Sequence, residues 1–73
     1  MSRLPQVSGS DVVSALQRIG FSVRRQHGSH IIMRRDSPFA QTVVPNHRQI
    51  DRGTLRAILR QIGLSPEEFP RLL

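Results

Sequence analysis

Cysteine is missing from this 73-residue sequence, and so are lysine, tryptophan and tyrosine. Without cysteine, neither disulfides nor thiolate metal ligands can hold the fold together. Apolar residues make up 37% of the chain but occur in runs of only two or three, whereas a membrane span needs about 20 in succession. No charged and then apolar signal segment opens the chain. We therefore expect a cytoplasmic protein with one thin hydrophobic core.

The charge balance points to polyanionic partners. Eleven arginines stand against five acidic residues, which gives a net charge of +6. A guanidinium group presents a planar fork of N–H donors that matches phosphate and carboxylate oxygens. This charge, on a chain with room for a single domain over residues 1–73, favours nucleic acid, an anionic membrane or an acidic protein as partner. The three phenylalanines are too few for the usual base-stacking platform of single-strand binders.

Apolar spacing predicts two amphipathic helices around three strands. Ser8 and Asp11 form a capping-box pattern at the start of the first helix, and Gly20 is expected as its C-cap. The second helix begins at Asp51 or Thr54 and ends near Gln61, and a Ser-Pro-Glu-Glu motif begins a short terminal helix. The strands, expected to pair as antiparallel hairpins, are Phe21–Gln26, His30–Arg34 and Phe39–Pro45.

Both helices have one apolar stripe, so we expect them to cover the same face of the sheet. Alternation on the second strand places Ile31 and Met33 inside and His30 and Arg34 outside, and Arg24 is expected outside as well. The predicted core consists of Val13, Leu16, Ile19, Phe21, Val23, Ile31, Met33, Val43, Leu55, Ile58, Leu59 and Ile62, and the terminal helix adds Phe69 and Leu72.

Five segments of the sequence together resemble one known family. In chain order they are Ile19-Gly20-Phe21, Gly28-Ser29-His30, Val44-Pro45-Asn46-His47, Arg52–Leu59 and Gly63–Phe69. In this order and at these spacings they are similar to the HicA-type toxins, also called YcfA-like proteins. The resemblance implies a double-stranded-RNA-binding-domain-like α+β fold, α-β-β-β-α, to which the Ser-Pro-Glu-Glu motif adds the short extra C-terminal helix. It also implies a ribonuclease that cleaves mRNA and that a HicB-type antitoxin neutralises. We expect no cofactor or metal, because cleavage by proton transfer does not require one.

The resemblance further implies that His30 is catalytic, because the catalytic histidine of these toxins follows a Gly-Ser pair, here Gly28-Ser29. Ile31 stands where family members often have a second histidine or an aromatic residue. His47 lies near a frequent histidine position and is a candidate second acid or base.

The local chemistry is compatible with such a role. RNA supplies its own nucleophile, the 2′-hydroxyl, so an enzyme needs only to move protons and stabilise the phosphorane charge. An imidazole moves protons near neutral pH, and Gly28 lets backbone N–H groups approach a phosphate closely. The residues equally fit a His30 that merely closes a hairpin, with His27 and His47 as solvated loop residues. Zinc binding by the three histidines is disfavoured, because an extended chain splays His27 and His30 apart.

Two sets of arginines are candidates for holding RNA. Arg52, Arg56 and Arg60 recur every four residues along the second helix, where like charges destabilise an isolated helix by about 0.2–0.5 kcal/mol per pair. Arg24, Arg25, Arg34 and Arg35 flank the hairpin that carries His30. The first set also fits a solvated helix face, and some of the second set also fit contacts with an acidic antitoxin. Alternative functions are therefore a non-catalytic RNA-binding module and a purely protein-binding partner.

Overall fold

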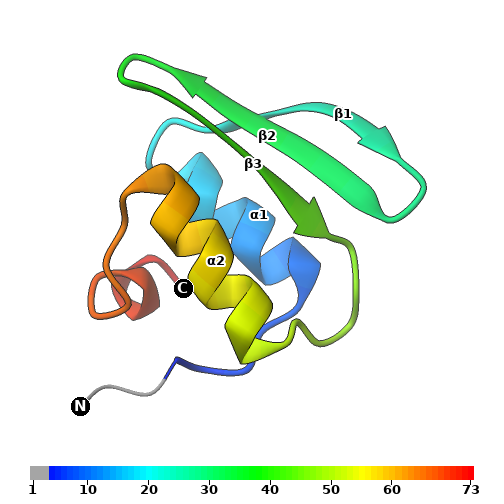
Figure 1. Ribbon diagram of the computed structural model, residues 1–73, viewed down its shortest axis with the longest axis vertical. Helices are drawn as coiled ribbons and strands as arrows, with labels where there is room; N and C mark the ends of the chain where they lie inside the picture. The colour runs from blue at the N-terminus through cyan, green and yellow to red at the C-terminus, as the bar shows by residue number, and fades with distance from the viewer. Residues whose placement is uncertain (1–3) are drawn as a thin grey trace.

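In the computed structural model, which describes residues 4–73, two helices cover one face of a three-stranded antiparallel sheet (Figure 1). The elements are α1 (Gly9–Gln17), β1 (Ser22–His27), β2 (His30–Asp36), β3 (Phe39–Pro45), α2 (Arg52–Ile62) and a closing 3-10 turn, η1 (Phe69–Leu72). The strands lie in the order β1-β2-β3, so that β2 is central. The expected α+β, double-stranded-RNA-binding-domain-like order α-β-β-β-α is confirmed.

The first helix begins where the capping box places it, and Gly20 closes it. The Ser8 hydroxyl accepts a hydrogen bond from the Asp11 N–H, and the Asp11 carboxylate accepts one from the Ser8 N–H, each at 3.0 Å. The regular helix ends at Gln17, followed by Arg18, and Gly20 closes its last turn as predicted. The Phe21 N–H donates to the Leu16 carbonyl at 3.1 Å and the Gly20 N–H to the Gln17 carbonyl at 3.3 Å, the bond pair of a Schellman motif. Gly20 has the positive φ, 96°, that this closing position requires and that glycine adopts without strain.

The second helix has a clear signal at each end. The Asp51 carboxylate accepts hydrogen bonds from the N–H groups of Gly53 and Thr54, so Asp51 rather than Thr54 is the N-cap. Gly63 ends the helix with a φ of 74°. The Ser-Pro-Glu-Glu motif also forms its cap, since the Ser65 hydroxyl donates to the Glu68 carboxylate at 2.8 Å. That cap opens only turns and the four-residue η1.

Most of the predicted core is buried between the sheet and the helices. Leu16, Phe21, Ile31, Met33, Leu55, Ile58, Leu59, Ile62 and Phe69 are buried, and Val13, Ile19 and Leu72 pack against them. The core also includes residues that the prediction omitted: Leu4, Val7, Val12, Ala15, Ala40, Val44 and Ile50. The lead-in segment is thus packed, with Val7 bridging to Ile50 and the Arg52 guanidinium donating to the Leu4 carbonyl at 2.7 Å.

Two predicted core valines are not buried. Val43 is 45% exposed and Val23 is 44% exposed. On β3 the inward residues are Thr42 and Val44, because they lie directly opposite the inward Met33 and Ile31 of β2. Val23 does lie opposite Met33, but every residue of β1 is exposed, so this edge strand extends beyond the helical layer.

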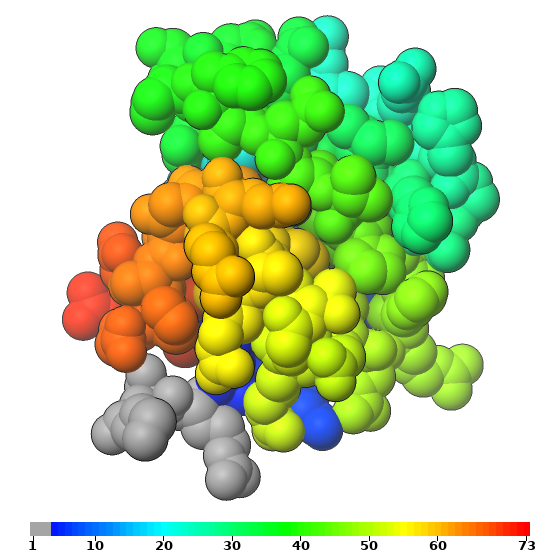
Figure 2. All heavy atoms as spheres, in the orientation of Figure 1, coloured from blue at the N-terminus to red at the C-terminus, as the bar shows by residue number. Residues whose placement is uncertain are grey.

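The buried hydroxyl group of Thr42 on β3 has a hydrogen-bond partner on α2. This hydroxyl donates to the Gln61 amide oxygen on α2 at 2.5 Å, which fixes the helix against the strand. Figure 2 shows the green β2–β3 hairpin standing above the yellow and orange α2. Both helices lie on one side of the sheet, so its other face is left uncovered (Figure 1).

Candidate nucleic-acid interface

The uncovered side of the sheet, called the open face here, is defined by the strand register. From one end to the other, it carries His27, His30 and Pro45, then Arg25, Ile32 and Val43, then Ser22, Arg34 and Gln41, and finally Asp36 and Phe39. Directly opposed residues of antiparallel strands point to the same face, so this list follows from pairing alone. Histidines gather at one end and arginines beside them.

His30 lies at the start of β2, where the β1–β2 hairpin closes. The turn consists of Gly28 and Ser29, and Gly28 has a φ of 56° while Ser29 does not have a positive φ, as in a type II′ turn. The Gln26 side-chain amide donates to the Gly28 carbonyl at 2.9 Å and so ties the turn down. Among residues 4–73 nothing hydrogen-bonds to the exposed His30 imidazole, which is therefore open to a ligand.

The loop that carries His47 is tied to this hairpin. The Asn46 N–H donates to the Ser29 carbonyl at 2.6 Å, and the Gly9 N–H donates to the His47 carbonyl at 2.8 Å. A Cβ at Gly9 would collide with the Pro45 carbonyl oxygen and would lie 2.9 Å from the Asn46 Cα. The close approach that glycine allows here thus holds the start of α1, the loop and the hairpin together. His47 itself lies two residues beyond Pro45, outside the strand.

A β-bulge places two arginines on the open face. The register between β1 and β2 shifts between Val23 and Arg25, so that Arg24 is the extra residue beside Arg25, opposite Ile32. A bulge of this kind locally breaks the alternation of a strand. Arg24 and Arg25 accordingly line a shallow hollow together with Ile32, Arg34 and Gln41. Both arginines are exposed, and neither pairs with a carboxylate among residues 4–73.

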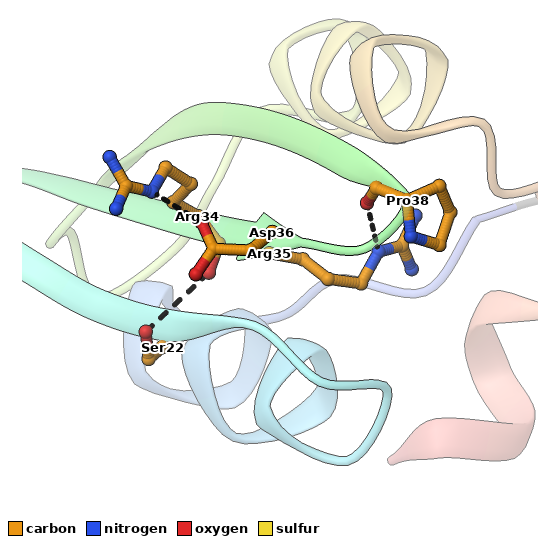
Figure 3. Close-up of polar contacts among 5 residues, drawn as sticks. All are labelled: Ser22, Arg34, Arg35, Asp36 and Pro38. Carbon is orange, nitrogen blue, oxygen red and sulfur yellow. Dashed lines mark hydrogen bonds and ion pairs between the residues drawn. The ribbon is translucent and has the colours of Figure 1, made fainter.

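Arg34 and Arg35 are neighbours with different roles (Figure 3). Arg34 faces the open side, where its Nε lies 3.0 Å from the Asp36 carboxylate. Arg35 faces the helical side and stacks on Phe21, with its guanidinium carbon 4.7 Å from the ring centroid. Its Nε donates to the Pro38 carbonyl at 3.0 Å. Arg35 is therefore a structural residue, and Arg34 is partly neutralised.

The arginines of α2 belong to a different surface. Arg56 and Arg60 are exposed on the side of α2 away from the buried Leu55 and Leu59, in the layer opposite the open face. Arg52, at the start of the same row, is half-buried and bonded to Leu4. The structure therefore separates Arg24, Arg25 and Arg34 from the helix row.

Four of the acidic residues are engaged away from Arg24 and Arg25. Asp11, Asp51 and Glu68 serve as helix or turn caps, and Asp36 pairs with Arg34. The positive potential therefore remains around Arg24 and Arg25, as a polyanion-binding surface requires.

Sequence reasoning missed one notable feature of the open face. Phe39 is 68% exposed at the end opposite His30, although it is one of only three aromatic residues. Its position could have been found from the alternation along β3, in which Phe39, Gln41 and Val43 share one side.

The described residues contain neither a cluster of metal ligands nor a membrane-spanning helix. Within residues 4–73, no three His, Asp or Glu side chains come together in a way that would hold a metal ion. No helix in the described part of the chain has the length and apolar character needed to cross a membrane.

Fold and surface define the class: a small, basic, α-β-β-β-α domain of the double-stranded-RNA-binding-domain-like kind, with histidines and arginines on an open sheet face. Comparison with known families makes this specific, because residues 9–64 match the model of the HicA toxin of bacterial toxin–antitoxin systems. The match covers most of the chain, so this protein belongs to the HicA toxin family. The family resemblance seen in the sequence is thereby confirmed. No curated protein gave a match.

Proposed function

We propose that this toxin is an endoribonuclease that cleaves mRNA, with His30 carrying a proton and Arg24 and Arg25 holding the phosphates. The observation that supports this most is the position of His30. It is an exposed imidazole on the open face, at a fixed hairpin, beside two arginines that have no carboxylate partner among residues 4–73. Family membership supports the toxin role.

The reaction needs only the RNA, these side chains and water. The 2′-oxygen attacks the adjacent phosphorus while the bond from phosphorus to the 5′-oxygen breaks. His30 either removes the 2′-hydroxyl proton or protonates the leaving 5′-oxygen, and the other proton is exchanged with water or a second group. The arginines stabilise the charge that develops on the phosphorus oxygens. The products are a 2′,3′-cyclic phosphate and a 5′-hydroxyl.

We also propose that a HicB-type antitoxin neutralises the toxin by covering the open face. An arginine-rich, uncovered sheet face complements an acidic partner, and it is the face on which His30 lies. A partner bound there would exclude RNA from the proposed site.

The test of the catalytic role is His30→Ala. We expect the variant to lose about 10²–10⁴-fold in cleavage rate while its fold and its affinity for RNA are largely retained. Cleavage by the wild type should fail on a substrate with a 2′-deoxy residue at the cleaved position and should persist in EDTA. Circular dichroism is the control for folding.

The non-catalytic binding module predicts the reverse ranking. Under that function, removing Arg24 or Arg25 would matter most and His30→Ala would change little. Folded His30→Ala protein that cuts RNA at the wild-type rate would refute the catalytic role.

A further inference from the structure

We propose that His27 is a second proton carrier, which acts with His30 as an acid–base pair on one phosphodiester. This inference rests on the proposed function and extends it to a residue that the sequence suggests only as part of a solvated turn. It is carried by the strand register, which pairs His27 with His30 at the closing position of the β1–β2 hairpin.

The pairing places the two imidazoles side by side. Directly opposed residues have Cβ atoms about 4.5–5.5 Å apart and point to the same face. Both histidines are exposed, and neither imidazole has a hydrogen-bond partner among residues 4–73. Imidazoles starting this far apart can reach the two opposite apical oxygens of one phosphorane.

His47 is the competing candidate, and the geometry favours His27 over it. His30 faces Pro45 on β3, so His47 lies two residues past that pair, in a loop whose carbonyl is bonded to α1. His47 is therefore not paired with any strand residue of the open face. His27 is paired with His30, and the tied Gly28-Ser29 turn fixes its spacing from His30.

The groups around the pair suit a phosphate between the imidazoles. Arg25 follows on the open face of β1, with the bulged Arg24 beside it, and His47 and Arg48 are the titratable and charged residues of the neighbouring loop. Both helices pack on the other side of the sheet. The groups that face the pair are thus cationic or neutral.

The two imidazoles together account for both proton transfers of the reaction. One imidazole takes the proton of the 2′-hydroxyl as the 2′-oxygen bonds to phosphorus. The other gives its proton to the 5′-oxygen as the bond from phosphorus to that oxygen breaks. The pair returns to its starting state by exchanging protons with water.

The first measurement is the pH dependence of kcat/KM on a defined RNA. We expect a bell-shaped profile for the wild type, because one group must be neutral and the other protonated. His27→Ala and His27→Gln should both be slower by about 10²–10⁴-fold and should both lose one limb of the bell. Glutamine keeps hydrogen bonding but not proton transfer, so a purely structural role would leave His27→Gln near the wild type.

The second measurement uses a substrate whose leaving 5′-oxygen is replaced by sulfur, because a thiolate leaves without needing a proton. This substrate should restore one of the variants His27→Ala and His30→Ala to near the wild-type rate and leave the other defective. The restored variant identifies the acid.

The outcomes separate the two proposals. If His30→Ala still cleaves, the proposed function itself fails. If His30→Ala is inactive but folded His27→Ala cleaves like the wild type, only this inference fails. It also fails if the sulfur substrate restores neither variant or both, or if His47→Ala, rather than His27→Ala, loses a limb of the profile.

Discussion

At the scale of single residues, two arginines of similar sequence context differ in what they contact. Arg25 lies on the open face without a carboxylate partner among residues 4–73, whereas Arg35 bonds to the Pro38 carbonyl and stacks on Phe21. Hydrogen bonds from a charged group to backbone carbonyls and stacking on an aromatic ring stabilise a fold, while an exposed, unpaired cation contributes little. Residue type alone does not separate the two roles.

We therefore predict opposite phenotypes for Arg35→Ala and Arg25→Ala. Arg35→Ala should lower the free energy of unfolding by about 1–3 kcal/mol, and Arg25→Ala should change it by no more than about 0.5 kcal/mol. Arg25→Ala should instead weaken RNA binding and reduce the slope of log K against log salt by about 0.7, the value for one phosphate contact on a single strand.

Urea unfolding and RNA titrations at several salt concentrations measure both quantities. Equal losses of stability in the two variants would contradict the structural role of Arg35, and an unchanged salt slope would contradict phosphate binding by Arg25.

At the scale of elements, β3 has one face in the core and one in solvent. Val44 is fully buried opposite Ile31, and its neighbour Val43 is 45% exposed opposite Ile32. Both are valines in one strand, so the difference between them comes only from the register.

This gives a matched pair of substitutions for the assignment of the two faces. Val44→Ala should cost about 1–3 kcal/mol, because buried methyl groups are lost and a void is left. Val43→Ala should cost at most about 1 kcal/mol, the full range of strand propensity. Chemical unfolding measures both, and a larger cost at Val43 than at Val44 would show that the strand faces the other way.

At the scale of the whole molecule, the cationic residues occupy two layers. Arg24 and Arg25 lie on the sheet, while Arg56 and Arg60 lie on the outer side of α2. The molecule measures 33 × 27 × 17 Å, so one rigid partner that covers the open face does not need to touch the helix row. The proposed antitoxin contact can therefore be located by charge reversal.

We predict that the toxin with its HicB-type antitoxin bound does not cleave RNA and that added salt weakens the complex. Arg25→Glu should lower the affinity for the antitoxin much more than the matched change Arg56→Glu on α2. Titration calorimetry with each variant measures this. A complex that leaves the nuclease fully active, or a greater loss from Arg56→Glu, would place the antitoxin elsewhere.

Much of the fold follows from local sequence. The order of elements, the Ser8–Asp11 capping box, the Asp51 cap and the glycine at the end of α2 are each specified within about four residues. The apolar stripe of α2 likewise predicts which side of this helix is buried, because helical spacing alone places Leu55 and Leu59 on one side. The sequence also predicted His30 on the outer face, from alternation on β2.

Tertiary structure decided which strand residues meet and which arginines remain exposed. The bulge at Arg24 depends on how β1 pairs with β2. Pairing with β2 also decides that Val44, and not Val43, points into the core, because two adjacent valines do not show by themselves which one is buried. The packing of Leu4, far in sequence from Arg52, depends on contacts that no local pattern encodes. The pairing of His27 with His30 depends on a hairpin turn whose register only the folded chain fixes. Local hydrogen bonds are satisfied by near neighbours and can be predicted from the sequence, whereas the faces and partners of strands are chosen by the burial of the whole sheet.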